Sequence, residues 1–346
     1  MNRRSIAAAL AAGIVLAGCG QNNSSTASNI DLPAADRAAM SADTRAGKNA
    51  QLYVGNWPYG ESFVSVYNTK KKGPLATITD GISRPLPAIG PDGRLYVANE
   101  GNATVTIYDS AKHHLMQTFS TGKLSEPTKL AFDSTGTIYA LCPGGVVVFP
   151  SGSQQNEYIL PGNRYGIAVD SMNDLYVSAG PKVYGYKPGA RKHFVVLHDG
   201  ISSAASIAVD PNDNLYIANS RYRKKDPGSV AVYNTVSNSL EYVLTNAQGV
   251  HGPTNVLVGS DGNLYVANGL GGPQSVTVYP PGQTTLIRTI TSGLDQPAGL
   301  AMDSSGNLYV SNLGANDVTV YAPKTTAVLR TITKGMGGPY GLAFGL

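Results

Sequence analysis

The feature that most constrains the fold is a repeat that runs along almost the whole chain. A short segment built on Leu or Ile, then Tyr, then Val, Ile or Ala recurs seven times. Its tyrosines lie 37 to 49 residues apart and are Tyr53, Tyr96, Tyr139, Tyr176, Tyr216, Tyr265 and Tyr309. Repeats of this length, rich in short strands, are typical of a β-propeller, in which each repeat forms one blade. We therefore predict one all-β domain with seven blades, although 346 residues would allow two domains.

Each repeat divides into four short strands. In the last complete repeat we expect strands over 299–303, 308–312, 318–321 and 329–333, because apolar residues alternate there with period two. The middle residue of the innermost strand is usually alanine, which suits the crowding expected near the axis. The residues concerned are Ala131, Ala168, Ala208, Ala301 and Ala343.

The two ends of the array are complementary. The first repeat begins at its second strand, 52–56, and the chain finishes with an innermost strand from Pro339 to Phe344 that no second strand follows. Pairing these two strands would complete one blade and remove the exposed edges of an open array. We therefore predict a seven-bladed propeller that is closed by its C-terminal strand.

The N-terminus predicts export and lipidation. Residues 1–18 have the basic start and short apolar run of a signal peptide, and Leu16 to Cys19 resembles the lipobox of bacterial lipoproteins. That resemblance implies a lipidated Cys19, and Gly20 implies transport to the outer membrane of the cell envelope. The alternative is an ordinary signal with a chance cysteine. We predict that residues 19–50 form a disordered tether and that residues 51–346 form the propeller.

Composition narrows the classes of partner. The charged fraction is 14% and the formal net charge is +4, which does not favour nucleic acid, and we expect a monomer. The basic insert from Arg221 to Lys225 could meet an anionic surface, although a solvated loop is the preferred interpretation. Cys142 is expected to be a buried thiol. The Asp residues in the hairpin turns are expected to serve the turns rather than calcium, because the loops are too short for a calcium loop.

The consensus Pro-x-Gly-Leu-Ala-x-Asp-x-x-Gly-Asn-Leu-Tyr-Val-x-Asn resembles the NHL family and the neighbouring YVTN group of bacterial propellers. The resemblance covers about 52–344. It implies the propeller fold, but these families include scaffolds, ligand-binding domains and some enzymes, so activity must be argued from the site.

Candidate binding residues are those that depart from the repeat near the predicted mouth of the central channel. A mixed polar and aromatic mouth would suit a protein, peptide or glycan ligand, whereas isolated polar residues at loop ends can also be merely solvated. The candidates are Trp57, Tyr59, Arg84, Glu126, Lys129, Arg164, Tyr165, His251, Asn255 and Tyr340.

An enzymatic alternative is a metal-dependent lyase or lactonase with its site at the mouth. Gluconolactonase-type propellers use Glu, Asn and Asp ligands, and the positions after the strand-initiating prolines lack them here. Streptogramin lyase-type propellers use a His and a Glu with magnesium, and only His251 and Glu126 could be nominated. The sequence shows no positioned catalytic pair. We expect a binding or scaffolding module with no cofactor, and the question of catalysis stays open.

Overall fold

The computed structural model describes residues 50–57, 60–68, 73–122, 124, 126–153, 155, 158–162, 165–220, 227–270 and 272–345. Several predictions fall outside these residues: the signal peptide, the lipidated Cys19, all of the tether but its last residue, Tyr59, Arg164 and the basic insert.

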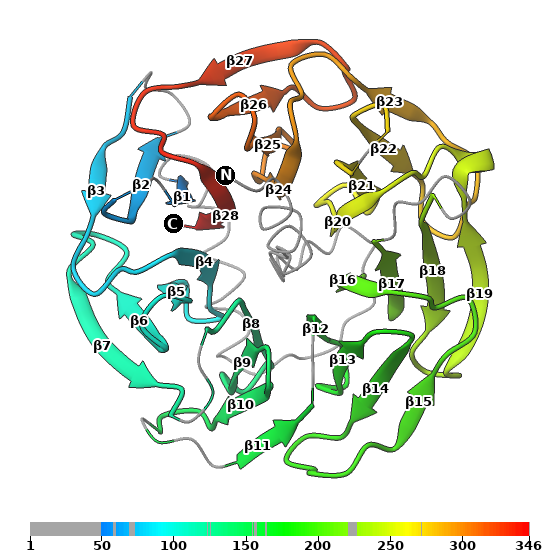
Figure 1. Cartoon of the computed structure of the whole chain (residues 1–346), viewed down its shortest axis with the longest axis horizontal. Coiled ribbons are helices and arrows are strands. Elements are labelled where there is room, and N and C mark those ends of the chain that lie inside the picture. The colour runs from blue at the N-terminus through cyan, green and yellow to red at the C-terminus, as the bar shows by residue number, and fades with distance from the viewer. Residues whose placement is uncertain are drawn as a thin grey trace, which may run out of the picture.

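Seven four-stranded antiparallel sheets form a ring around a central axis (Figure 1). From the axis outwards, the first blade contains β28 (Pro339–Gly345), β1 (Gln51–Asn56), β2 (Phe63–Asn68) and β3 (Ala76–Ile78). The second contains β4 (Pro85–Ile89), β5 (Leu95–Asn99), β6 (Thr104–Tyr108) and β7 (Leu115–Ser120). The third contains β8 (Lys129–Phe132), β9 (Ile138–Cys142), β10 (Gly145–Phe149) and β11 (Tyr158–Pro161).

The remaining four blades repeat this order. The fourth contains β12 (Gly166–Val169), β13 (Leu175–Ala179), β14 (Lys182–Tyr186) and β15 (Val195–Leu197). The fifth contains β16 (Ala204–Val209), β17 (Asn214–Asn219), β18 (Ser229–Asn234) and β19 (Ser239–Leu244). The sixth contains β20 (Pro253–Val258), β21 (Leu264–Asn268), β22 (Ser275–Tyr279) and β23 (Arg288–Ile290). The seventh contains β24 (Pro297–Met302), β25 (Leu308–Asn312), β26 (Asp317–Tyr321) and β27 (Val328–Ile332).

Closure of the ring by the C-terminal strand is confirmed. β28 pairs antiparallel with β1, so that Phe344 lies opposite Leu52 and Ala343 lies opposite Tyr53. The described residues include one 3-10 turn, η1 (Asn246–Gln248), and no helix that is long and apolar enough to cross a membrane.

The apolar core is divided among the seams between blades. Each seam buries a cluster of Leu, Val, Ile and Tyr side chains, which is why the strands alternate with period two. The alanines of the innermost strands have a more specific reason than crowding at the axis. Ala301 lies directly opposite Tyr309, and Ala343 lies opposite Tyr53, so the small residue faces the large ring of the second strand.

Asparagine at the end of the second strand holds the loop that enters the same blade. Asn99 is fully buried; its Oδ1 accepts the N–H of Ser83 at 3.1 Å, and its Nδ2 donates to the hydroxyl of Thr106 at 2.9 Å. Five blades share this contact, through Asn56, Asn99, Asn219, Asn268 and Asn312. Blades 3 and 4 have Cys142 and Ala179 at that place.

Tyrosine in the third strand holds the same loop from the other side. The hydroxyl of Tyr321 donates to the carbonyl of Ser292 at 2.5 Å, and that of Tyr279 donates to Gln248 at 2.7 Å. The same five blades make this contact, through Tyr67, Tyr108, Tyr233, Tyr279 and Tyr321. Blade 3 has Phe149 there, which cannot donate. The Asn and Tyr contacts together are called the loop clamp below.

Candidate functional site

The mouth is the face on which the outer strand of one blade leads into the innermost strand of the next. Five blades have a proline at the start of that strand or just before it, and the residue before this proline has a left-handed backbone. Glycine takes this position in blades 1 and 6, at Gly338 and Gly252. Blades 2, 3 and 7 use Arg84, Glu126 and Gln296, with φ of 51°, 61° and 53°. A left-handed backbone at a non-glycine residue costs about 1–2 kcal/mol, so three long polar side chains are held at the mouth despite a backbone cost.

An aromatic pair lies next to Arg84, where blades 1 and 2 meet. Trp57 follows β1, and its ring stacks on Tyr340 of β28, with the ring centres 4.4 Å apart. Trp57 Nε1 donates to the carbonyl of Pro85 at 3.2 Å, which ties blade 1 to blade 2. The guanidinium of Arg84 lies 4.9 Å from the centre of the Trp57 ring. Because Tyr340 is only 4% exposed, it supports Trp57 and offers no open ring face to a ligand.

Glu100, on the loop after β5, completes this cluster. Its Oε1 accepts from Arg84 Nη2 at 3.0 Å, and its side chain is 11% exposed. Its Oε2 is buried and has no hydrogen-bond partner among the described residues. Burial raises the pKa of Glu100, the guanidinium of Arg84 lowers it, and the carboxylate of Glu126 raises it. One acceptor atom at the mouth is therefore left unsatisfied.

Lys129 is the most unusual charged residue of the inner ring. It is the first residue of β8, is 3% exposed, and its Nζ has no partner among the described residues. It lies opposite Leu141 and on the same strand face as Ala131, so its side chain points into the seam with blade 4. Burial lowers the pKa of this amine to about 7. Cys142 is fully buried, as predicted, and burial raises the pKa of its thiol to about 12.

The structure places the other candidates in blades 4 and 6. His251 Nε2 bonds to the carbonyl of Pro273 at 2.8 Å, which holds a loop of its own blade. Asn255 joins three blades, because its Nδ2 donates to Ala298 O at 3.2 Å and its Oδ1 accepts from Ser206 Oγ at 3.0 Å. Tyr165 is 39% exposed before β12. His251 and Glu126 belong to blades 6 and 3, with at least two blades between them.

The structure therefore brings Trp57, Arg84 and Tyr340 together, with Glu126 within electrostatic range of Glu100. Sequence reasoning missed Glu100 and Gln296. Glu100 could have been found as the one acidic residue that directly follows a second-strand Asn, and Gln296 as the equivalent of Arg84 and Glu126 before a proline.

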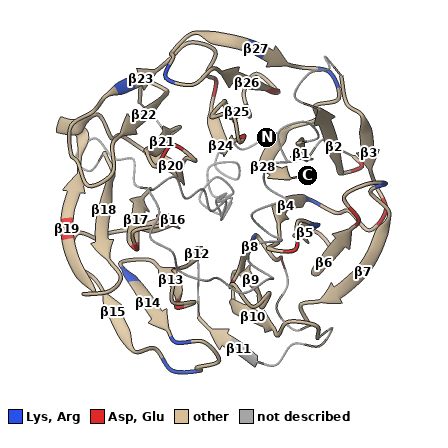
Figure 2. Ribbon diagram, turned by 180° about the vertical axis from the view of Figure 1, so that it is seen from behind, with Lys and Arg blue, Asp and Glu red and all other residues tan. Residues whose placement is uncertain are grey.

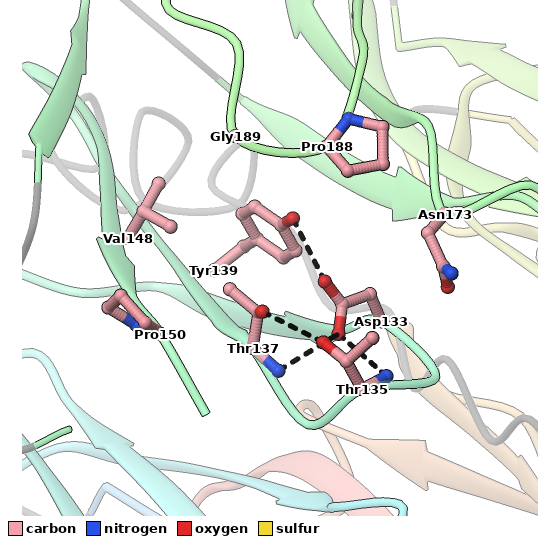
Figure 3. Close-up of a pocket in the computed structure, with 9 residues that line it drawn as sticks. All are labelled: Asp133, Thr135, Thr137, Tyr139, Val148, Pro150, Asn173, Pro188 and Gly189. Atoms are coloured by element: carbon pink, nitrogen blue, oxygen red, sulfur yellow. Dashed lines mark hydrogen bonds between the residues drawn. The ribbon is translucent and has the colours of Figure 1, made fainter. Parts of the chain in front are cut away.

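The cavity lined by the hairpin turn of blade 3 does not add a second site. It has a volume of about 150 Å³ and lies between blades 3 and 4 on the face opposite the mouth (Figure 3). Its polar groups bond to one another: Asp133 accepts from Thr135 Oγ1 at 2.6 Å, from Thr137 N at 2.9 Å and from Tyr139 OH at 3.2 Å. This contact set confirms the turn role predicted for Asp133. Among the described residues, Figure 2 shows basic and acidic positions scattered around the ring rather than gathered into one patch.

Comparison with known proteins identifies the fold alone. No protein-family model matches the sequence, and no curated protein matches it. A solved structure described as Kuenenia stuttgartiensis hydrazine synthase is similar, with a TM-score of 0.63 and 14% identity over 78% of this chain and 91% of that one. A streptogramin B lyase structure is also similar, with a TM-score of 0.64 and 13% identity over 85% of this chain and 91% of that one. The protein is a seven-bladed β-propeller.

Proposed function

We propose that the chain is an exported, lipid-anchored propeller of the NHL or YVTN type that binds a peptide segment of a partner at its mouth. The binding surface is the arc formed by blades 7, 1, 2 and 3, which carries Gln296, Trp57, Arg84, Glu100 and Glu126. The lipobox resemblance at Leu16 to Cys19 supports anchoring in the cell envelope, and the repeat consensus supports the family.

The observation that carries the proposal is the unsatisfied Oε2 of Glu100. A buried acceptor without a donor costs about 1–3 kcal/mol, and more when it is charged. A ligand whose donor group reaches this atom, once the side chains that cover it move aside, recovers part of that loss. Arg84 already occupies Oε1 and fixes the carboxylate. With Glu126 nearby, the arc favours a ligand that brings an ammonium, guanidinium or amide N–H group.

The same geometry favours a peptide over a glycan. Sugar rings bind to open aromatic faces, but Tyr340 is buried beneath Trp57, and Arg84 lies against the Trp57 ring. The exposed Tyr165 belongs to blade 4, outside the arc.

Binding to a peptide array by the full-length chain in detergent tests the proposal. We expect the wild-type protein to select peptides with Lys, Arg or a free amino terminus. Glu100→Gln should weaken that binding by about 10–100-fold, because it removes a charge-assisted hydrogen bond. Glu241→Gln is the matched control, since Glu241 is exposed on β19, the outer strand of blade 5. Equal binding by wild type and Glu100→Gln, or selection of glycans instead of peptides, would contradict the proposal.

The lyase or lactonase alternative gains no specific support from these contacts. The described residues contain no group of three or more His, Cys, Asp or Glu side chains placed to hold a metal. His251 is engaged by Pro273. Elemental analysis of the purified chain, with turnover assays of His251→Ala and Glu126→Ala, would revive this alternative if a bound metal and a loss of activity were found.

A further inference from the structure

The hairpin turn between the first and second strands is closed in the same way in blades 5 and 7. In blade 5 the turn residue Asp210 accepts backbone N–H groups at Oδ1, and its Oδ2 accepts from Asn214 Nδ2 at 2.8 Å and from Tyr216 OH at 3.0 Å. In blade 7, Asp303 Oδ2 accepts from Asn307 Nδ2 at 2.8 Å and from the next tyrosine. Both oxygens of the turn carboxylate are therefore satisfied.

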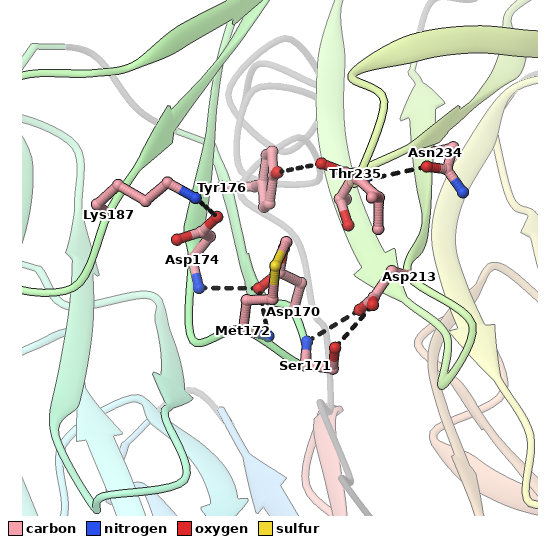
Figure 4. Close-up of polar contacts among 10 residues, drawn as sticks. Asp170, Ser171, Met172, Asp174, Tyr176, Lys187, Asp213, Asn234 and Thr235 are labelled. Carbon is pink, nitrogen blue, oxygen red and sulfur yellow. Dashed lines mark hydrogen bonds and ion pairs between the residues drawn. The ribbon is translucent and has the colours of Figure 1, made fainter.

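Blade 4 breaks this pattern at two places. Asp170 still accepts backbone N–H groups at Oδ1, from Met172 at 3.0 Å and from Asp174 at 2.8 Å. The residue at the asparagine position is Asp174, which brings a second carboxylate instead of an amide donor. The hydroxyl of Tyr176 donates to the carbonyl of Thr235 in blade 5, at 3.3 Å (Figure 4). Both donors to Asp170 Oδ2 have been lost.

Three buried oxygen atoms consequently lack partners at the seam between blades 4 and 5. They are Asp170 Oδ2, Asp174 Oδ1 and Thr235 Oγ1, none of which makes a hydrogen bond of normal distance and angle to another described residue. Asp170 is 6% exposed, and Asp174 and Thr235 are each 1% exposed. Burial raises the pKa of Asp170, the carboxylate of Asp174 also raises it, and the Thr235 hydroxyl, which approaches the Asp170 carboxylate as a hydrogen-bond donor, lowers it. All three groups are therefore close neighbours.

The seam between blades 4 and 5 carries an unbalanced negative charge, which a cation would neutralise. Lys187 Nζ pairs with Asp174 Oδ2 at 2.6 Å, which leaves the charge of Asp170 without a partner of opposite sign. An uncompensated buried carboxylate is strongly destabilising. The three free atoms are all hard oxygen donors, and neither His nor Cys lies among them, which suits Ca²⁺ rather than Zn²⁺.

We propose that this seam binds one Ca²⁺ ion through Asp170 Oδ2, Asp174 Oδ1 and Thr235 Oγ1, and that the ion fastens blade 4 to blade 5. Water completes the coordination shell, since Ca²⁺ takes six to eight oxygen ligands. The site differs from the hairpin turns of blades 5 and 7, in which Asp210 and Asp303 serve the turn itself, and it does not depend on ligand binding at the mouth. With only two carboxylates, its dissociation constant should be about 10⁻⁴–10⁻³ M, as in extracellular calcium modules.

The test compares wild type with Asp174→Asn in the full-length protein after EDTA treatment and dialysis. Calorimetric titration with CaCl₂ should show one ion per chain for wild type. Calcium at about 100 times its dissociation constant should raise the ratio of folded to unfolded protein about 100-fold, seen as a higher Tm, and Mg²⁺ should act more weakly. Asp174→Asn should lose the calcium response. It should also be at least as stable as wild type in EDTA, because the introduced amide restores the donor that Asn214 and Asn307 supply in their own turns.

Asp80→Asn serves as the control, because Asp80 is an exposed carboxylate in the loop before β4, and it should keep the full calcium response. Two results would overturn the proposal: no calcium-dependent heat or Tm shift in wild type at about 10 mM, well above the expected dissociation constant, or an undiminished response in Asp174→Asn. A proton shared by the two carboxylates would give the first result, together with a wild-type stability in EDTA that falls as pH rises through the raised pKa of Asp170.

Discussion

Blades 1, 2, 5, 6 and 7 are held together differently from blades 3 and 4. In the five, the loop clamp joins the second and third strands to the entering loop on the mouth face. Blades 3 and 4 replace the clamp asparagine with Cys142 and Ala179. The buried, unpartnered Lys129 lies at the seam between these two blades.

Blades 3 and 4 have instead a side-chain connection on the opposite face, which joins them to each other and also joins blade 4 to blade 5, where the clamp is present as well. Ser134 N donates to Asn173 Oδ1 at 2.8 Å, which joins blade 3 to blade 4. Ser171 donates to Asp213 through its N–H at 2.9 Å and its hydroxyl at 2.7 Å, which joins blade 4 to blade 5. Asn173 and Asp213 have left-handed backbones at positions where other blades have Gly136, Gly262 or Gly306. The difference shows that stabilising polar contacts can lie on either face of a propeller. In blades 3 and 4 they lie on the face opposite the mouth, so the mouth ends of these two blades are not held by a clamp asparagine.

Removing the amine of Lys129 should have the largest effect. Because its pKa is lowered to about 7 in the folded chain but is near 10 when unfolded, the unfolded state binds more protons between these values. Wild-type stability should therefore rise by about 3 kcal/mol from about pH 7 to pH 9.5 through this group alone. Lys129→Met should be more stable at pH 7 and should lack this rise. Denaturant unfolding at several pH values measures the difference, and parallel pH profiles for the two proteins would contradict the assignment.

Breaking one clamp should have the next largest effect. Asn312→Ala removes the acceptor for Asp295 N and the donor to Thr319 Oγ1, and leaves buried polar groups unsatisfied, so the free energy of unfolding should fall by about 2–4 kcal/mol. Cys142→Ala changes the same position in blade 3, where no clamp exists, and should cost about 1 kcal/mol. Urea titration of both variants tests the contrast. Equal losses would show that the asparagine contributes only its volume.

The connection on the opposite face should contribute least. Asp213→Gly removes the two bonds to Ser171 but relieves a left-handed backbone with φ of 61°, so the net loss should be about 0–1 kcal/mol. Asp213→Ala keeps the backbone strain and should lose more. The same urea titration measures both variants. If Asp213→Gly lowered the free energy of unfolding more than Asp213→Ala did, the claim that Asp213 has a strained backbone would be contradicted.

The fold followed from the sequence because its period is visible in every repeat and because the unpaired ends are complementary. The role of the repeated asparagines did not follow. Asn favours turns for its own backbone reasons, and only the structure shows that Asn99 reaches from one strand to the loop before another.

The candidate site was predicted in part. Trp57, Arg84 and Tyr340 could be chosen as departures from the repeat, but their stacking depends on blade closure. The left-handed backbones of Arg84, Glu126 and Gln296 could not be predicted, because a residue before proline normally favours an extended conformation. Glu100 was missed because charged residues in loops are usually solvated, and its position directly after a second-strand asparagine was not recognised as a signal.

Native-state hydrogen exchange of the clamped loop amides tests the central claim most directly. These are the N–H groups of Ser83, Ser202, His251, Asp295 and Gly337, each donated to a clamp asparagine. We expect all five to be protected in wild type, and we expect Asn312→Ala to accelerate exchange at Asp295 by about 10–100-fold while the other four keep their rates. Unchanged exchange at Asp295, or equal acceleration at all five amides, would contradict a clamp that acts blade by blade.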